Sequence, residues 1–80
     1  MGKRLEAMRA NPFDNWRIAD VEAVCAEFDV GCEPVRGGGS HYKVSHPKMK
    51  SKPSIPFARP IKPVYIRQLI RFLDEVAKLS

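Results

Sequence analysis

The most informative absence in this 80-residue chain is the lack of acidic residues between Pro34 and Leu73. Seven of the nine acids precede Pro34, and the other two are Asp74 and Glu75. The acid-free stretch carries nine bases, which are Arg36, Lys43, Lys48, Lys50, Lys52, Arg59, Lys62, Arg67 and Arg71. Because the bases of a merely solvated surface would be scattered over both halves, this asymmetry indicates a polyanionic partner.

Other absences narrow the class of protein. No apolar run approaches the roughly 18 residues of a transmembrane helix, and the first residues lack the apolar core of a signal peptide. Glu6 stands where a myristoylation signal has serine or threonine. We therefore expect a cytoplasmic protein that binds no membrane. Cys25 and Cys32 lack zinc-ligand spacing, so we expect two small hydrophobic side chains, and we expect no metal and no cofactor.

Hydrophobic periodicity predicts three helices and three strands. Helix-forming residues run from Lys3 to Ala10 and stop at Asn11-Pro12, and apolar residues recur at helical spacing from Arg17 to Phe28. The third helix starts at Pro63, a residue that suits the first helical position. The predicted strands are short segments bounded by glycine, proline or a basic turn, namely Val30 to Arg36, Ser40 to His46 and Ser54 to Ala58.

This order predicts an α+β fold in two layers, with helices packed on one face of a three-stranded antiparallel sheet. Residues 1–15 form an N-terminal extension with an extra short helix, and residues 16–80 form the main domain. Pro34 favours an edge position for the first strand. Asp74 lies four residues before Lys78 on the outer side of the last helix, which predicts an ion pair between them.

Strand alternation selects one histidine as the candidate catalytic residue. In a regular strand from Ser40 to His46, Tyr42 and Val44 share one face, and His41 and Lys43 share the other. The apolar pair identifies the core face, so His41 points into solvent, just after three consecutive glycines. A histidine titrates near neutral pH and can exchange a proton with a ribose hydroxyl or a leaving oxygen held by nearby bases. The alternative is an exposed histidine with no function.

Other catalytic arrangements have less support. His46 lies five residues after His41, so the two side chains point to opposite faces unless a bulge intervenes. Followed by Pro47, His46 is typical of a strand end that packs against or bonds to the turn, and we expect it to be structural. Ser40 points away from His41, and no acid in the basic half can orient the imidazole, which argues against serine–histidine–acid catalysis.

Phosphate contacts are expected from basic residues around this histidine. Lys43 shares its strand face, and Lys48 lies in the basic turn after the strand. Arg59 and Lys62 flank the start of the last helix, where unpartnered amide groups can bind a phosphate. Phe57 alternates onto the core face of its strand, so we expect it to pack there and not to stack on bases.

Several motifs resemble the HicA toxins of HicA–HicB toxin–antitoxin systems. They are Gly39-Ser40-His41, the continuation from Tyr42 to Pro47, Ile55-Pro56-Phe57, and Ile61-Lys62-Pro63 before a helix. The resemblance runs from about Ile18 to Leu73. It implies a double-stranded-RNA-binding-like fold, metal-independent cleavage of mRNA, and a catalytic histidine after the glycine–serine pair, which is His41 here.

The resemblance also implies a protein partner, a HicB-like antitoxin that covers the active site, and it places Gly39 and Ser40 among the residues that contact RNA. Two features depart from the family pattern. Many members begin at the helix that corresponds to Arg17 to Phe28, so residues 1–15 are additional. Members often carry a second histidine where Tyr42 stands, so no imidazole can assist catalysis at that position.

Two further functions remain as alternatives to a ribonuclease toxin. A non-catalytic RNA-binding module would use the same basic surface, with His41 as a contact residue. A protein-interaction domain would pair its exposed sheet edge with another chain. Neither alternative requires a glycine–serine–histidine motif on a solvent-facing strand.

Overall fold

The computed structural model describes residues 3–35, 40–58 and 60–79. Within these ranges the chain forms, in order, α1 (Lys3–Ala10), α2 (Ile18–Glu27), β1 (Gly31–Pro34), β2 (His41–Ser45), β3 (Ser54–Pro56) and α3 (Pro63–Lys78). The α+β class expected from the sequence is confirmed, and every predicted helix and strand is present in the expected order.

The three strands form one antiparallel sheet in the order β1-β2-β3. β1 pairs with β2 from Gly31 opposite Ser45 to Pro34 opposite Tyr42. On its other side, β2 pairs with β3, and His41 lies opposite Pro56. β2 is therefore held along both sides. β1 lies at an edge of the sheet, as predicted, and the missing N–H of Pro34 is tolerated at an edge.

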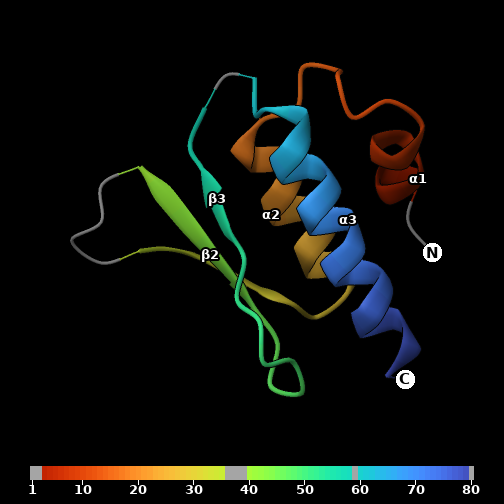
Figure 1. Cartoon of the computed structure of the whole chain (residues 1–80), viewed down its shortest axis with the longest axis vertical. Helices are drawn as coiled ribbons and strands as arrows, with labels where there is room; N and C mark the ends of the chain where they lie inside the picture. The colour runs from red at the N-terminus through yellow and green to blue at the C-terminus, as the bar shows by residue number, and fades with distance from the viewer. Residues whose placement is uncertain (1–2, 36–39, 59, 80) are drawn as a thin grey trace.

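α2 and α3 cover one face of the sheet (Figure 1). The core between the two layers is apolar, and no polar or charged residue is buried in the part of the chain that the structure describes. Its fully buried side chains include Val21 and Val24 from α2, Leu69 and Leu73 from α3, and Val44 and Ile55 from the sheet. Each such side chain contributes roughly 1.5–3 kcal/mol, so this interface supplies most of the driving force for folding.

The ends of α2 are capped by local contacts. At its start, the Asp20 carboxylate accepts a hydrogen bond of 3.0 Å from the backbone N–H of Arg17. At its end, Asp29 has a positive φ of 56°, and the N–H of Val30 donates to the carbonyl of Cys25 at 2.9 Å. This left-handed residue reverses the chain and directs it into β1.

α1 packs on the side of α2 and α3 that faces away from the sheet (Figure 1). Leu5 and Met8 of α1 are buried against the other two helices, with Met8 fully inaccessible. Two ion pairs reinforce this packing, because Arg4 binds Glu27 of α2 at 2.8 Å and Arg9 binds a carboxylate of α3. Within the predicted N-terminal extension, α1 thus adds its apolar side chains to the same hydrophobic core.

Two sequence expectations about contacts are wrong. Asp74 is paired with Arg9 of α1 at 2.7 Å, and Lys78 is paired with Glu75 at 3.4 Å, so the expected pair between Asp74 and Lys78 is not formed. β3 ends at Pro56, two residues earlier than predicted. Phe57 lies beyond the strand, where the alternation no longer applies, and it is 42% exposed.

No helix in the described ranges is both long enough and apolar enough to cross a bilayer.

Candidate active site

β2 presents His41 and Lys43 to solvent on the face of the sheet that the helices leave open. Along the strand, His41 and Lys43 are exposed, Tyr42 is half-buried and Val44 is fully buried. This alternation is the one predicted from the sequence, and it follows from packing Tyr42 and Val44 against the helices. The candidate catalytic residue therefore lies on the surface, with its side chain accessible to a large substrate.

The backbone around His41 is fixed on both sides of the strand. The carbonyl of His41 accepts a hydrogen bond of 2.9 Å from the N–H of Val35. The carbonyl of Ser40 accepts a hydrogen bond from the N–H of Phe57. The ring centroids of Phe57 and Tyr42 are 6.1 Å apart. Because neighbouring strands hold the main chain, the exposed imidazole is attached to a rigid segment of backbone. This favours precise positioning of a reacting group.

The open face of the sheet carries one feature that the sequence did not predict. The cross-strand register places Glu33 of β1 directly opposite Lys43, and both side chains are exposed. In the sequence, Glu33 belongs to the acidic N-terminal part, and only the pairing of β1 with β2 brings it next to the basic segment. A predicted register with Pro34 opposite Tyr42 would have placed Glu33 opposite Lys43, so strand register is the signal that could have identified this pair.

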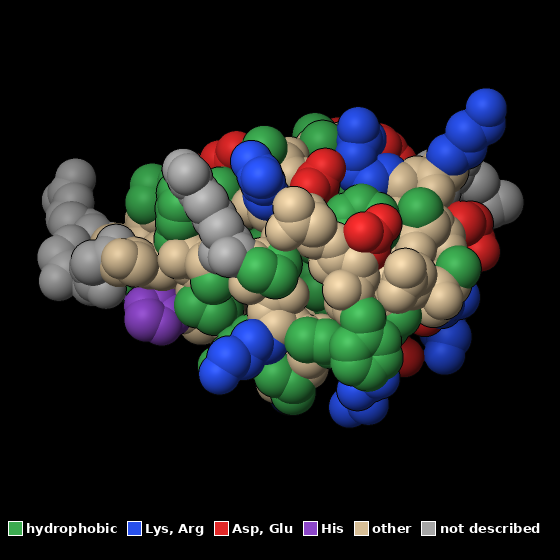
Figure 2. Space-filling view, turned by 90° about the horizontal axis from the view of Figure 1, so that it is seen from above, with side chains coloured by type: hydrophobic (Ala, Val, Ile, Leu, Met, Phe, Trp, Pro, Cys, Tyr) green, Lys and Arg blue, Asp and Glu red, His purple; other side chains and the backbone are tan. Residues whose placement is uncertain are grey.

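The predicted phosphate-binding residues are only partly brought together. Ser40 and Lys62 are exposed, and Figure 1 shows that β2 and α3 begin at the same end of the molecule. Figure 2 looks onto this end and shows a histidine at the surface, with hydrophobic side chains and a Lys or Arg side chain beside it. Gly39 and Arg59 lie outside the described residues.

The start of α3 offers fewer amide donors than expected. Pro63 occupies the first turn and has no N–H. The amides of Tyr65 and Ile66 both donate to the carbonyl of Lys62, at 3.0 and 3.3 Å. A phosphate bound here would depend on the Lys62 side chain more than on the helix N-terminus.

His46 and Lys48 lie at the far end of β2 from His41. His46 is half-buried, and its Nδ1 accepts a hydrogen bond of 3.1 Å from the backbone N–H of Lys48. This contact agrees with the expectation that His46 bonds to the turn. Five residues of extended chain span roughly 16–17 Å, so Lys48 is not a neighbour of His41, although both were predicted to meet the same ligand.

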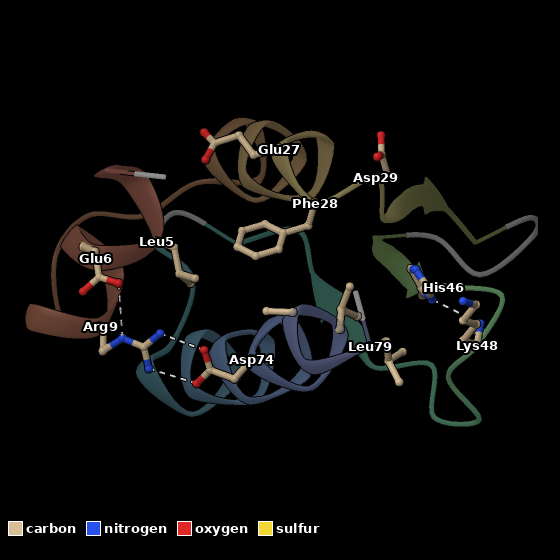
Figure 3. A pocket seen from close by; sticks show the side chains of 12 residues that line it. Leu5, Glu6, Arg9, Glu27, Phe28, Asp29, His46, Lys48, Asp74 and Leu79 are labelled. Carbon is tan, nitrogen blue, oxygen red and sulfur yellow. Dashed lines mark hydrogen bonds and ion pairs between the residues drawn. The ribbon is translucent and has the colours of Figure 1, made fainter. Parts of the chain in front are cut away.

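His46 and Lys48 line a groove of about 950 Å³ on the helical side of the molecule. The groove lies between the C-terminal ends of α2 and α3, with Leu5 of α1 on one side and the two residues of the turn on the other (Figure 3). Its walls mix apolar residues with both signs of charge. It is separate from the open sheet face, so this groove and the candidate catalytic histidine are different places.

Four bases in the described part of the basic half face solvent without an acidic partner. Within the described ranges, no carboxylate lies within 4.0 Å of a charged nitrogen of Lys43, Lys62, Arg67 or Arg71. Arg67 lies over the ring of Phe13 at 5.3 Å from its centroid, and that ring is 71% exposed. Unpaired bases leave a positive potential that attracts polyanions over a distance of about one Debye length.

Both cysteines are free thiols. Cys25 of α2 is fully buried, and Cys32 faces it from the core side of β1. The hydrogen bond to Cys32, together with burial, raises the pKa of Cys25, whereas the same bond lowers the pKa of Cys32. Among the described residues, no three His, Cys, Asp or Glu side chains are grouped as metal ligands would be.

Comparison of the chain with models of protein families, with curated proteins and with solved structures finds no match in any of the three. The function must therefore be inferred from the residues and their arrangement.

Proposed function

We propose that this protein is a metal-independent endoribonuclease of the HicA toxin type, which cleaves mRNA with His41 as a proton-transfer residue. The observation that carries the proposal is the position of His41, which is exposed on a rigid central strand next to the exposed Lys43. A lysine that binds the phosphate and an imidazole that moves a proton are the two groups that cleavage of an RNA backbone needs first.

The fold supports the same proposal. α2, three antiparallel strands and α3 follow one another in the chain, and both helices lie on one face of the sheet. This is the helix–strand–strand–strand–helix order of the double-stranded-RNA-binding-like fold that the resemblance to HicA toxins implies. In this proposal, α1 is an addition to that fold that stabilises the helical layer.

Control by a protein partner follows from the same chemistry. A cytoplasmic ribonuclease with an exposed active residue must be blocked until it is needed. A HicB-like antitoxin that presents acidic groups to Lys43 and covers His41 would exclude RNA from the open face. Opposite charges on the two surfaces would also accelerate their association.

The first test is cleavage of mRNA by the purified protein in the presence of a chelator. We expect cleavage at the same rate with chelator and with added Mg²⁺, because His41 moves the proton itself. Activity that disappears with chelator and returns with Mg²⁺ would contradict the proposal. Tight RNA binding without cleavage under either condition would instead favour the non-catalytic RNA-binding module.

A further inference from the structure

The open face of the sheet contains one carboxylate among the strand residues that the structure describes, and it belongs to Glu33. Glu33 lies directly opposite Lys43. His41 is paired with Val35, whose N–H donates to its carbonyl at 2.9 Å. Glu33 is therefore the diagonal cross-strand neighbour of His41, on the same face, with about 7–8 Å between the two Cα atoms. Lys43 completes a triangle with these two residues.

Cleavage of RNA without a metal requires two proton transfers at opposite ends of one phosphodiester. A base takes the proton from the ribose 2′-hydroxyl, and an acid gives a proton to the 5′-oxygen that leaves. A single imidazole cannot flank both oxygens in one in-line displacement. A site with one histidine therefore lacks a partner, and a carboxylate a short distance away, across a lysine that can bind the phosphate, fits that position.

We infer that Glu33 is the general base and His41 the general acid of the proposed ribonuclease, an assignment that rests on the proposed function. The Glu33 carboxylate accepts the 2′-hydroxyl proton as the bond from O2′ to phosphorus forms. The bond from phosphorus to O5′ breaks, and O5′ takes a proton from the His41 imidazolium. The products are a 2′,3′-cyclic phosphate and a 5′-hydroxyl, and Lys43 offsets the charge that develops on the phosphate.

The assignment of roles follows from ordinary acid–base chemistry. A carboxylate has only acceptor oxygens, so Glu33 suits the base that takes the 2′-hydroxyl proton. An imidazolium carries N–H donors, so His41 suits the acid that protonates the leaving oxygen. The simpler role for Glu33 is a cross-strand ion pair that stabilises the sheet. However, neither Glu33 nor Lys43 has an oppositely charged group within 4.0 Å in the described part of the chain.

The test uses two dinucleotide substrates that differ only in the leaving atom, which is oxygen in one and sulfur in the other. A thiolate leaves without a proton, so the sulfur substrate does not need the acid. We expect His41→Ala to lose about 10²- to 10⁴-fold on the oxygen substrate and to recover most of that loss on the sulfur substrate. Glu33→Gln should lose a similar factor on both substrates, because the base is needed in each case.

Two controls separate catalysis from folding. Glu33→Asp keeps the carboxylate and should retain more activity than Glu33→Gln, although both would weaken a cross-strand contact. Glu22→Gln removes an exposed carboxylate from α2 and should leave both rates unchanged. Thermal unfolding of all variants should be close to that of the wild type, since Glu33 is exposed.

The outcomes distinguish this inference from the proposed function. Glu33→Gln within about threefold of the wild type would overturn the assignment of Glu33 while leaving the ribonuclease in place. Recovery of Glu33→Gln on the sulfur substrate would show that the roles are reversed and would also overturn it. A wild-type protein that cleaves neither the dinucleotides nor mRNA would overturn the proposed function and this inference with it.

Discussion

His41 and His46 are five positions apart, yet the structure gives them different environments. His41 is exposed on the open face of the sheet, between two strands that fix its backbone. His46 is half-buried on the helical side, where its Nδ1 accepts the N–H of Lys48 at 3.1 Å. Side chains alternate between the two faces along β2 and the residue that follows it. His41 is therefore accessible to a substrate, whereas His46 bonds to the turn.

We expect His46→Ala to affect stability and not catalysis. The substitution removes the acceptor for the Lys48 amide, and a hydrogen bond of this kind contributes about 0.5–1.5 kcal/mol to the free energy of unfolding. Urea denaturation should show a loss of that size, while the RNA cleavage rate of the folded fraction stays within a few-fold of the wild type. A folded His46→Ala protein as inactive as His41→Ala would restore a site with two histidines.

The residues whose positions were predicted correctly from the sequence differ in a physical way from those whose positions were not. His41, Lys43 and the core residue Val44 lie in one strand, so local alternation was sufficient to assign their faces. Glu33 and Phe57 depend on non-local information, namely the register of β1 on β2 and the point at which β3 ends. Pairing across strands is decided by the whole sheet, and a single segment does not contain it.

At the scale of the elements, α1 is the part whose role the sequence left open. Its two ends are tied to different helices, because Arg4 binds Glu27 of α2 and Arg9 binds Asp74 of α3. Each pair spans more than 20 residues of chain, and the sequence offered no pattern by which to choose such partners. The sequence predicted an ion pair of Asp74 with Lys78, one turn further along α3. Asp74 instead forms a bidentate ion pair with Arg9 of α1.

The link between α1 and α3 predicts a pH-dependent contribution to stability. The Arg9 guanidinium donates to both oxygens of Asp74, at 2.9 and 2.7 Å, and lowers the pKa of that carboxyl below its ordinary value of 3.8. A group with a depressed pKa stabilises the fold above its ordinary pKa, and this contribution is lost as the pH falls through the lower, folded-state value.

We therefore expect Asp74→Asn to lower the free energy of unfolding at neutral pH and to match the wild type in strong acid. The paired side chains are 43% and 39% exposed, so solvent screening limits the loss to about 1 kcal/mol or less. Urea denaturation at several pH values measures the difference. Glu75→Gln, which breaks only the looser contact with Lys78, is the matched control. A difference that persists unchanged in strong acid would show that the effect does not come from the ion pair.

At the scale of the whole molecule, ten of the 14 bases follow Pro34 in the chain, and seven of the nine acids precede it. The net charge is +5, and the exposed bases Lys43, Lys62, Arg67 and Arg71 face solvent without carboxylates within 4.0 Å in the described residues. Such a surface binds a polyanion by displacing its counterions, and binding then weakens as salt rises.

Binding of single-stranded RNA to an inactive His41→Ala protein should fall steeply with salt. Lys43→Gln and Lys62→Gln should each reduce the slope of log K against log salt by about one unit if each removes a phosphate contact. Lys48→Gln should change the slope less, because Lys48 lies beside the groove at the far end of β2. A salt-independent affinity would show that the basic surface serves a partner other than RNA.

The central claim is that His41 itself carries out RNA cleavage, and the most direct test compares His41→Ala with the wild type in the presence of chelator. His41 is exposed and supports no buried contact, so the variant should fold with unchanged stability. We predict that its cleavage rate falls by at least about 10²-fold, the loss typical of a removed acid–base group. A folded His41→Ala protein that cleaves RNA as fast as the wild type would contradict the account.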